Sequence, residues 1–116
     1  MIIVSGAVDS GAFSCCLPVE DARHLQIPDR ALREAGEIVL ADDTTVPYLE
    51  SAVHVRAQVL LRASLTVSAR PWGPIFELRP AFVPEGSRLF GQRDFFSRFE
   101  ITFRRHVSPA SFTLCY

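Results

Sequence analysis

The sequence contains no lysine, and all twelve of its basic residues are arginine. A coding sequence rich in G and C explains this bias more simply than a site for phosphate groups does. The net charge of −1 predicts neither nucleic acid nor a membrane surface as a partner. The charge is divided unevenly, because residues 1–50 carry three arginines against nine acidic residues and residues 51–116 carry nine against four.

The chain also lacks long apolar runs. Apolar residues make up 48% of the sequence, but no run approaches the roughly 18 residues that a membrane-spanning helix needs. The apolar N-terminus has no basic segment before it and meets Asp9 too early for a secretion signal. These absences predict a cytoplasmic protein with no membrane partner.

Cysteine is scarce, with three residues that form no C-x-x-C pair and no Cys/His spacing typical of a zinc site. Cys15 and Cys16 are adjacent, and neighbouring side chains on a strand point to opposite faces, so they are poor partners for a disulfide. We expect these thiols to act as small buried apolar side chains, and we expect no metal and no cofactor.

Internal repeats, linkers and low-complexity segments are absent too, and 116 residues are too few for two independent cores. The sequence therefore predicts a single domain over residues 1–116. Helix signals are few: a proline followed by acids in 17–27, one or two turns in 29–36 closed by Gly36, and a short helix in 92–99. The phenylalanines of this last segment, together with Phe103, are expected to pack in the core.

Alternating apolar and polar residues are, in contrast, abundant, and this period of two is typical of half-buried strands. The predicted strands lie at 53–61, 65–69, 75–83, 99–103 and 111–115. Turn-forming residues separate them at 42–44, 71–74, 84–87 and 108–109. The sequence thus predicts a mostly β fold, either a sandwich or a barrel.

Two short motifs carry the candidate chemistry. The first is Ala-Val-Asp-Ser-Gly-Ala at 7–12, in which a short apolar strand stops to present the carboxylate of Asp9 on a Ser-Gly turn. The second is Arg-Leu-Phe-Gly-Gln-Arg-Asp-Phe-Phe at 88–96. By itself the first motif also fits an ordinary turn, in which the aspartate accepts hydrogen bonds from nearby N–H groups.

Together the two motifs resemble those of the retropepsin-like aspartic proteases, the single-domain family that includes the retroviral proteases. In that family an Asp-Ser/Thr-Gly-Ala loop follows an apolar strand, and a later apolar-apolar-Gly turn packs beneath the loop. The resemblance implies that Asp9 is the catalytic residue. It implies support for the active-site loop from Ser10, Gly11 and Ala12. It assigns the packing turn to Leu89, Phe90 and Gly91.

The resemblance extends over nearly the whole chain. A short strand over 13–17 and the Leu-Pro segment over 17–27 follow the first motif, as in cellular and prokaryotic members. Residues 37–55 are similar to the flap, a hairpin that closes over a bound peptide. The candidate flap residues are Asp42, Asp43, Thr44 and Thr45. The implied fold is a closed β-barrel or sandwich with one or two short helices, acting as a homodimer.

A dimer also follows from the chemistry of carboxyl-catalysed peptide hydrolysis. One carboxyl group cannot be both the base for the attacking water and the acid for the carbonyl oxygen. Two close carboxyl groups can, because like charges prevent both from ionising; the aspartic-protease dyad is the established example. This sequence offers one such aspartate, so a second Asp9 across a two-fold axis must supply the other.

The resulting hypothesis is an aspartic endopeptidase that acts on a peptide or protein substrate. In such a dimer the Ser10 hydroxyl would hydrogen-bond across the dyad. Gly11 would let the two loops approach without a clash at Cβ.

Two alternatives stay open. A catalytically silent module of the same fold would serve dimerisation or peptide binding; the acidic flap tip favours it, as do the eight residues before Asp9, where the family has a further strand or hairpin. Either the chain extends upstream of Met1, or residues 112–116 carry the dimer sheet alone. Nucleic-acid binding, which we do not expect, would use the C-terminal arginines: Arg88, Arg93, Arg98, Arg104 and Arg105.

Overall fold

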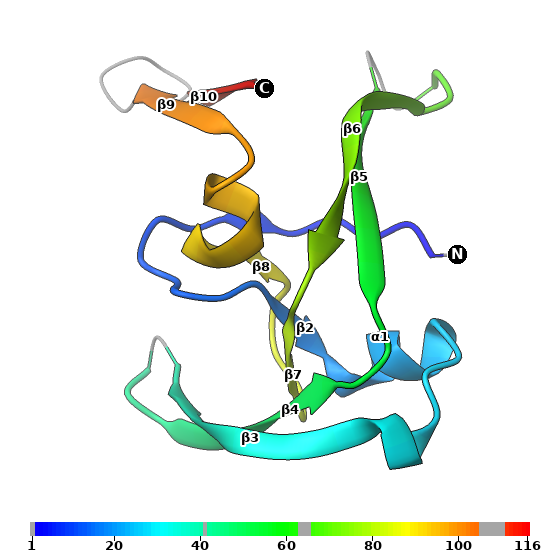
Figure 1. The fold of residues 1–116 in the computed structure, drawn as a ribbon. Helices are drawn as coiled ribbons and strands as arrows, with labels where there is room; N and C mark the ends of the chain where they lie inside the picture. Colours follow the sequence, from blue (N-terminus) through cyan, green and yellow to red (C-terminus); the bar gives the residue numbers. More distant parts are fainter. Residues whose placement is uncertain (1, 41, 63–65, 105–110) are drawn as a thin grey trace.

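The computed structural model describes residues 2–40, 42–62, 66–104 and 111–116 of the chain, and strands are the main secondary structure of these residues (Figure 1). The strands are β1 (Ala7–Val8), β2 (Cys16–Pro18), β3 (Leu32–Val39), β4 (Thr45–Ser51), β5 (Val55–Leu61), β6 (Arg70–Leu78), β7 (Ala81–Val83), β8 (Leu89–Phe90), β9 (Glu100–Arg104) and β10 (Ser111–Cys115). The helical segments are α1 (Val19–His24), the 3₁₀ turn η1 (Asp29–Ala31) and the short irregular helix η2 (Gln92–Phe96). The prediction of a mostly β fold is confirmed.

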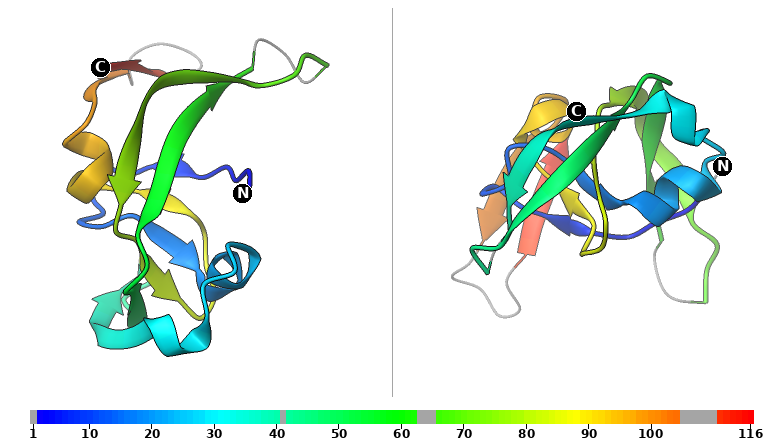
Figure 2. Two further views of the ribbon diagram at one scale, coloured as in Figure 1. Left: turned by 45° about the vertical axis from the view of Figure 1, so that its right-hand side comes forward. Right: turned by 90° about the horizontal axis from the view of Figure 1, so that it is seen from below.

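The described strands form one six-stranded sheet in the order β1-β8-β2-β7-β4-β3 and two hairpins, β5-β6 and β9-β10. The expectation of a closed barrel is therefore wrong for the described part of the chain. Closure requires the edge strands of a sheet to pair with each other. Here one edge is β1, which has only two residues, and the β5-β6 hairpin rises away from β3-β4 as a separate arm (Figures 1 and 2).

Helix prediction succeeds at one segment and fails at another. The segment that begins at Pro18 forms α1, with its acids in the first turn and a buried Ala22 on its inner face. The segment 29–36 gives only the 3₁₀ turn η1, because β3 begins at Leu32 and pairs with β4 over the length of both strands. β3 lies at the edge of the sheet, so this pairing satisfies the backbone groups of residues 32–39 that face β4. One or two helical turns would leave most of their backbone groups without a partner inside the helix.

Strand prediction fails around residues 65–74. The described residues of 65–69 lie in a turn and a bend rather than in a strand. The predicted turn at 71–74 lies inside β6, where a bulge leaves the pairing at Trp72 and resumes it at Phe76. The amide of Gln58 donates to the Gly73 carbonyl oxygen at 2.8 Å within this bulge. Turn-forming residues thus bend the strand here instead of ending it.

The predicted strand over 75–83 is broken after Leu78 into β6 and β7.

The remaining strand and turn predictions are mostly confirmed, at 53–61, 99–103 and 111–115 and at the turns 42–44 and 84–87. The predicted turn at 108–109 lies outside the described residues. Within the described residues, no helix is long and apolar enough to cross a membrane.

The core lies where η2 packs between the main sheet and the β5-β6 arm. Phe95 and Phe99 are buried there, and their rings contact that of Phe76 with centroids 6.2 and 5.5 Å away. Phe96 is half-buried, whereas Phe103 is 42% exposed, so the expectation of a wholly buried aromatic cluster is wrong at its outer end. The two adjacent thiols behave as expected, since both are buried and unbridged.

Candidate active site

The Asp9 loop begins where β1 ends. β1 pairs in parallel with β8, with Ala7 opposite Leu89, and this pairing continues as the Asp9 N–H donates to the Phe90 carbonyl oxygen at 3.0 Å. The chain then turns: the Ala12 N–H donates to the Asp9 carbonyl oxygen at 3.2 Å. The parallel pairing therefore fixes where the carboxylate of Asp9 leaves the sheet.

The carboxylate of Asp9 takes part in its own turn. Its Oδ1 accepts a hydrogen bond from the Gly11 N–H at 2.8 Å, as in the Asx turns that aspartate commonly forms. Asp9 is half-buried, while Ser10 and Gly11 are exposed and Ala12 is half-buried. The loop thus presents one carboxylate at the surface in a defined orientation.

The second motif lies directly beneath this loop. A Cβ atom built on Gly91 would stand 2.5 Å from the Ala12 carbonyl oxygen and 2.6 Å from that of Ser14, so only glycine fits. Beyond it, the Gln92 N–H donates to the Ala12 carbonyl at 2.9 Å and the Arg93 N–H to the Phe13 carbonyl at 2.7 Å. Two segments about eighty residues apart are therefore joined through backbone groups, with Leu89 and Phe90 half-buried in β8.

The predicted flap forms a hairpin, β3-β4, with its turn at the predicted place. The Thr44 N–H donates to Oδ1 of Asp42 at 3.0 Å, and Asp43 adopts a left-handed conformation with φ of 63°. Thr45 begins β4, and Leu40 closes the turn through its N–H to the Thr44 carbonyl at 2.8 Å. Hydrogen bonds from Thr44 hold the pKa of Asp42 below its ordinary value.

Thiol chemistry is disfavoured beside the Asp9 loop. Burial raises the pKa of the Cys16 thiol, and the negative charge of Asp9 raises it further. Burial also raises the pKa of Cys15, whose Sγ donates to the Arg93 carbonyl oxygen at 3.5 Å. Both thiols are therefore protonated at neutral pH and are poor nucleophiles.

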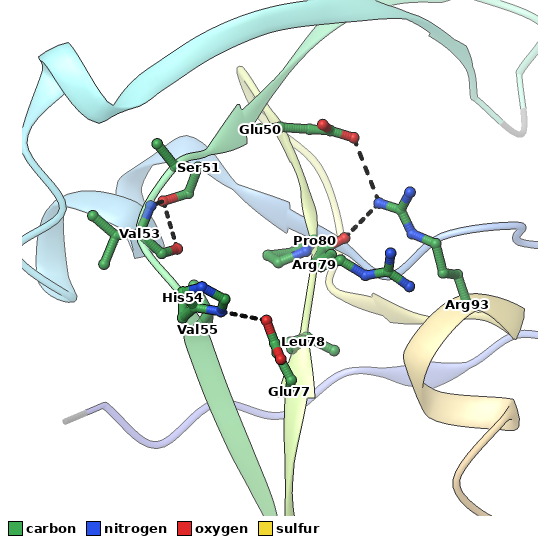
Figure 3. Close-up of a pocket in the computed structure, with 11 residues that line it drawn as sticks. Glu50, Ser51, Val53, His54, Val55, Glu77, Leu78, Arg79, Pro80 and Arg93 are labelled. Atoms are coloured by element: carbon green, nitrogen blue, oxygen red, sulfur yellow. Dashed lines mark hydrogen bonds and ion pairs between the residues drawn. The ribbon is translucent and has the colours of Figure 1, made fainter.

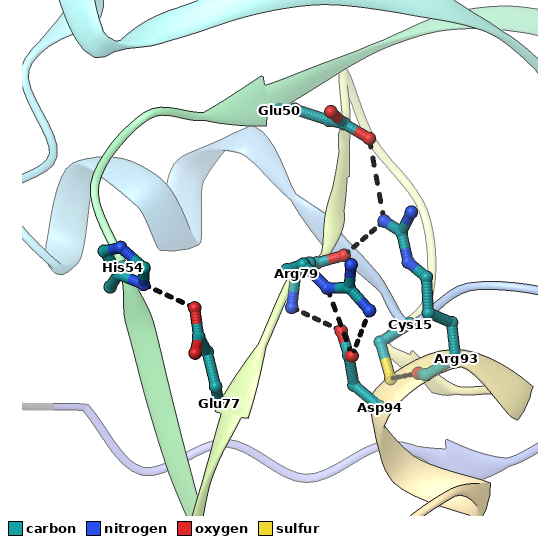
Figure 4. A network of polar contacts seen from close by, with 7 residues as sticks. All are labelled: Cys15, Glu50, His54, Glu77, Arg79, Arg93 and Asp94. Atoms are coloured by element: carbon teal, nitrogen blue, oxygen red, sulfur yellow. Dashed lines mark hydrogen bonds and ion pairs between the residues drawn. The ribbon is translucent and has the colours of Figure 1, made fainter.

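Two ion pairs that the sequence analysis did not predict brace the second motif. Buried Asp21 of α1 accepts two hydrogen bonds from Arg88, at 2.7 and 2.9 Å, which ties the helix to the residue before β8. Asp94, in a left-handed conformation within η2, accepts the Arg79 N–H at 2.6 Å and its guanidinium at 2.9 and 3.2 Å (Figure 4). The sequence does place each of these acids next to apolar residues, which indicates that the acid could be buried. Which arginine pairs with each acid could be read only from the tertiary structure.

The electrostatics of Asp94 reflect this environment. Burial by itself would raise its pKa, but the hydrogen bonds and charge of Arg79, with the charge of Arg93, outweigh burial and hold it below the ordinary value. The Arg93 guanidinium in turn donates to the Arg79 carbonyl at 2.7 Å and lies 3.6 Å from Glu50 of β4 (Figure 4). The helix beneath the Asp9 loop is thus anchored to the neighbouring elements.

A hollow of about 230 Å³ lies between the β4-β5 connection and the β6-β7 turn (Figure 3). Its ionisable side chains are all paired: His54 Nδ1 with Glu77 Oε1, Glu50 with Arg93, and Arg79 with Asp94 outside the lining. All residues predicted for the protease site lie outside the lining. The arrangement resembles a braced polar surface more than a reaction centre.

The arginines considered for nucleic-acid binding do not share one role in the structure. Arg88 and Arg93 pair with acids within the chain, and Arg104 donates to the Thr113 hydroxyl across β9-β10. Arg98 is exposed, and Arg105 lies outside the described residues. Intramolecular pairing reduces the charge available to phosphate groups.

Comparisons with protein-family models, with curated proteins and with solved structures give no match. In the part of the chain that the structure describes, no group of three or more His, Cys, Asp or Glu side chains could hold a metal ion. The candidate site is therefore the Asp9 loop together with the segments that contact it.

Proposed function

We propose that this chain is one subunit of a homodimeric, retropepsin-like aspartic endopeptidase, in which Asp9 of each subunit contributes one carboxyl group. The observation that carries the proposal is the seating of the Asp9 loop on the Leu-Phe-Gly turn. Gly91 contacts the loop where no side chain fits, and the parallel pairing of β1 with β8 directs Asp9 out of the sheet. An ordinary surface turn needs no such support.

The arrangement of the elements supports a dimer on one face of the molecule. The loop that follows β1, the outer end of the β3-β4 hairpin and the β9-β10 hairpin lie toward the same side (Figures 1 and 2). A two-fold axis on that side would bring two Asp9 loops together beneath two hairpins. Such an interface is isologous, so each residue near the axis meets its own copy.

The β9-β10 hairpin supplies the apolar surface for this interface. Phe103 and Phe112 face each other across the two strands, with ring centroids 6.1 Å apart, and are 42% and 46% exposed. An isolated two-stranded hairpin is only marginally stable in water, so burying this face against a second copy stabilises both chains.

The mechanism follows from two carboxyl groups sharing one proton. The ionised Asp9 accepts a proton from water as the water attacks the carbonyl carbon of the substrate. The protonated Asp9 of the partner chain donates its proton to the carbonyl oxygen, giving a neutral tetrahedral intermediate. Its collapse, with protonation of the leaving nitrogen, breaks the C–N bond and restores the shared proton.

The β3-β4 hairpin would cover the substrate in this dimer. An extended peptide gains backbone hydrogen bonds from a hairpin laid over it, and closure excludes water from the carboxyl pair. The acidic tip, Asp42 and Asp43, would lie at the end of the hairpin that moves. No cofactor or metal takes part in this mechanism.

The acidic tip also favours a second candidate, a catalytically silent module with the same fold that binds peptides without cleaving them. The glycine-rich tips of the retroviral flaps bend readily. Here Asp42 instead braces the turn through Thr44. A hairpin with a stiffer tip can still hold an extended peptide, so this module would dimerise and bind.

One experiment separates the two functions. Purified protein is incubated with a peptide library below neutral pH, with Asp9→Asn and the exposed Asp29→Asn as matched variants. The endopeptidase predicts cleavage that a statine-type compound inhibits, that Asp29→Asn retains, and that Asp9→Asn lowers by a factor on the order of 10³ or more. Undiminished cleavage by Asp9→Asn would refute the proposal, and peptide binding without any cleavage would favour the silent module.

A further inference from the structure

The side chain of Gln92 forms a hydrogen bond to the loop that carries Asp9. This side chain is exposed, yet its Nε2 donates to the carbonyl oxygen of Ser10 at 2.9 Å, joining η2 to the Asp9 loop. The backbone N–H groups of Gln92 and Arg93 hold the loop at Ala12 and Phe13, and any residue could supply those. The Ser10 contact, in contrast, depends on the side chain.

The position of this bond within the loop is informative. The Ser10 carbonyl and the Gly11 N–H belong to the same planar peptide unit. Gln92 binds one end of that unit, and Oδ1 of Asp9 binds the other at 2.8 Å. Because the unit is rigid, fixing its oxygen also fixes the direction of its N–H. A donor on the carbonyl further polarises the peptide and strengthens the N–H as a donor.

We propose that Gln92 is a positioning residue, which sets the orientation of the Asp9 carboxylate through the Ser10–Gly11 peptide unit. This inference rests on the proposed function for its catalytic consequence, because it names a residue that acts on the same site. Gln92 does not touch the reacting atoms. It keeps one oxygen of Asp9 bound to Gly11, which leaves the other oxygen for the water and the partner carboxyl group.

Gln92→Met tests the proposal, because methionine has a similar length and no donor. We expect kcat to fall about tenfold with KM within about twofold, since a misoriented carboxylate slows the chemical step more than binding. Gln92→Lys, which keeps a donor on a long side chain, restores most of the rate.

Gln58 provides a matched control within the same chain. Its Nε2 also donates to a backbone carbonyl, that of Gly73, at 2.8 Å, but in the bulge of the β5-β6 arm. Gln58→Met removes the same kind of bond from the same kind of residue. We expect it to leave kcat and KM unchanged.

A second measurement does not depend on turnover. Amide hydrogen exchange at Gly11 reports directly on its bond to Asp9, and Gln92→Met should accelerate it several-fold while Gln58→Met does not. Unchanged exchange at Gly11 overturns the inference whatever the activity, and so does an undiminished kcat. If Gly11 responds but the wild-type protein never cleaves, the positioning role stands and the endopeptidase proposal fails.

Discussion

At the scale of single residues, two glycines beside the candidate catalytic aspartate differ in what limits them. Gly91 is limited within the chain, because a Cβ atom there would overlap the backbone of Ala12 and Ser14. Gly11 is not, since a Cβ atom there would meet only Oδ1 of Asp9, at 3.2 Å. The proposed dimer gives Gly11 a different constraint, the approach of a second loop.

Alanine substitutions at these two glycines should therefore affect different properties, the stability of the chain at Gly91 and dimerisation at Gly11. Gly91→Ala should lower the free energy of unfolding by about 2–3 kcal/mol, because backbone atoms cannot move aside as a side chain can. Gly11→Ala should leave the stability of the monomer within about 0.5 kcal/mol but weaken dimerisation and cleavage. Urea unfolding and sedimentation measure the two quantities, and a Gly11→Ala protein that still dimerises and cleaves normally would contradict the assignment.

At the scale of elements, the β3-β4 hairpin has a turn that organises itself. Asp42 accepts the Thr44 N–H, and Leu40 and Thr44 close the turn through the backbone. All of these bonds are local, so they hold the tip without help from the sheet at the other end of the hairpin.

Asp42→Ala should loosen this tip alone. Removing the acceptor of the Thr44 N–H should raise amide exchange at Thr44 and Asp43, with little change in the midpoint of thermal unfolding. Asp42→Asn keeps an acceptor oxygen and should preserve most of the protection. Hydrogen exchange followed by NMR checks this, and protection that survives Asp42→Ala would show that the backbone bonds alone hold the turn.

At the scale of the whole molecule, both hairpin arms expose apolar side chains, as do other places such as Ile3, Phe13 and Val39. The β9-β10 hairpin exposes Phe103 and Phe112, and the β5-β6 arm exposes others such as Ile75, at 61%. Only the first arm lies on the side of the Asp9 loop (Figures 1 and 2). The proposed dimer therefore buries one set of apolar side chains and leaves the other in solvent.

Phe112→Ser should accordingly weaken the dimer, and Ile75→Ser should not. Full burial of a phenylalanine contributes about 2 kcal/mol, but Phe112 is only 46% exposed, so each copy loses about 1 kcal/mol. The two-fold axis doubles this loss, so the dimer dissociation constant should rise roughly thirtyfold. Analytical ultracentrifugation over a range of concentrations measures it. A dimer that tolerates Phe112→Ser would place the interface elsewhere.

Much of the fold could be predicted from local chemistry. Alternation identified β5, β7, β9, β10 and part of β6. The acids after Pro18 identified α1, and the turn at 42–44 located the tip of the hairpin. Two of the failures have one cause. At 29–36 and at 71–74, residues with local preferences for a helical turn or a chain reversal were incorporated into strands, because long-range pairing with β4 and β5 satisfied more backbone groups.

The sequence by itself determined which residues could perform the chemistry: one aspartate on a Ser-Gly turn and one glycine after an apolar pair. Only the tertiary structure decided that these two segments touch, because the parallel pairing of β1 with β8 joins residues with no local relation. The tertiary structure alone showed that Gln92 binds Ser10 and that Arg88 binds Asp21, since these contacts join residues that are far apart in the sequence. Local preferences act over a few residues, whereas an active site is assembled from contacts between distant ones.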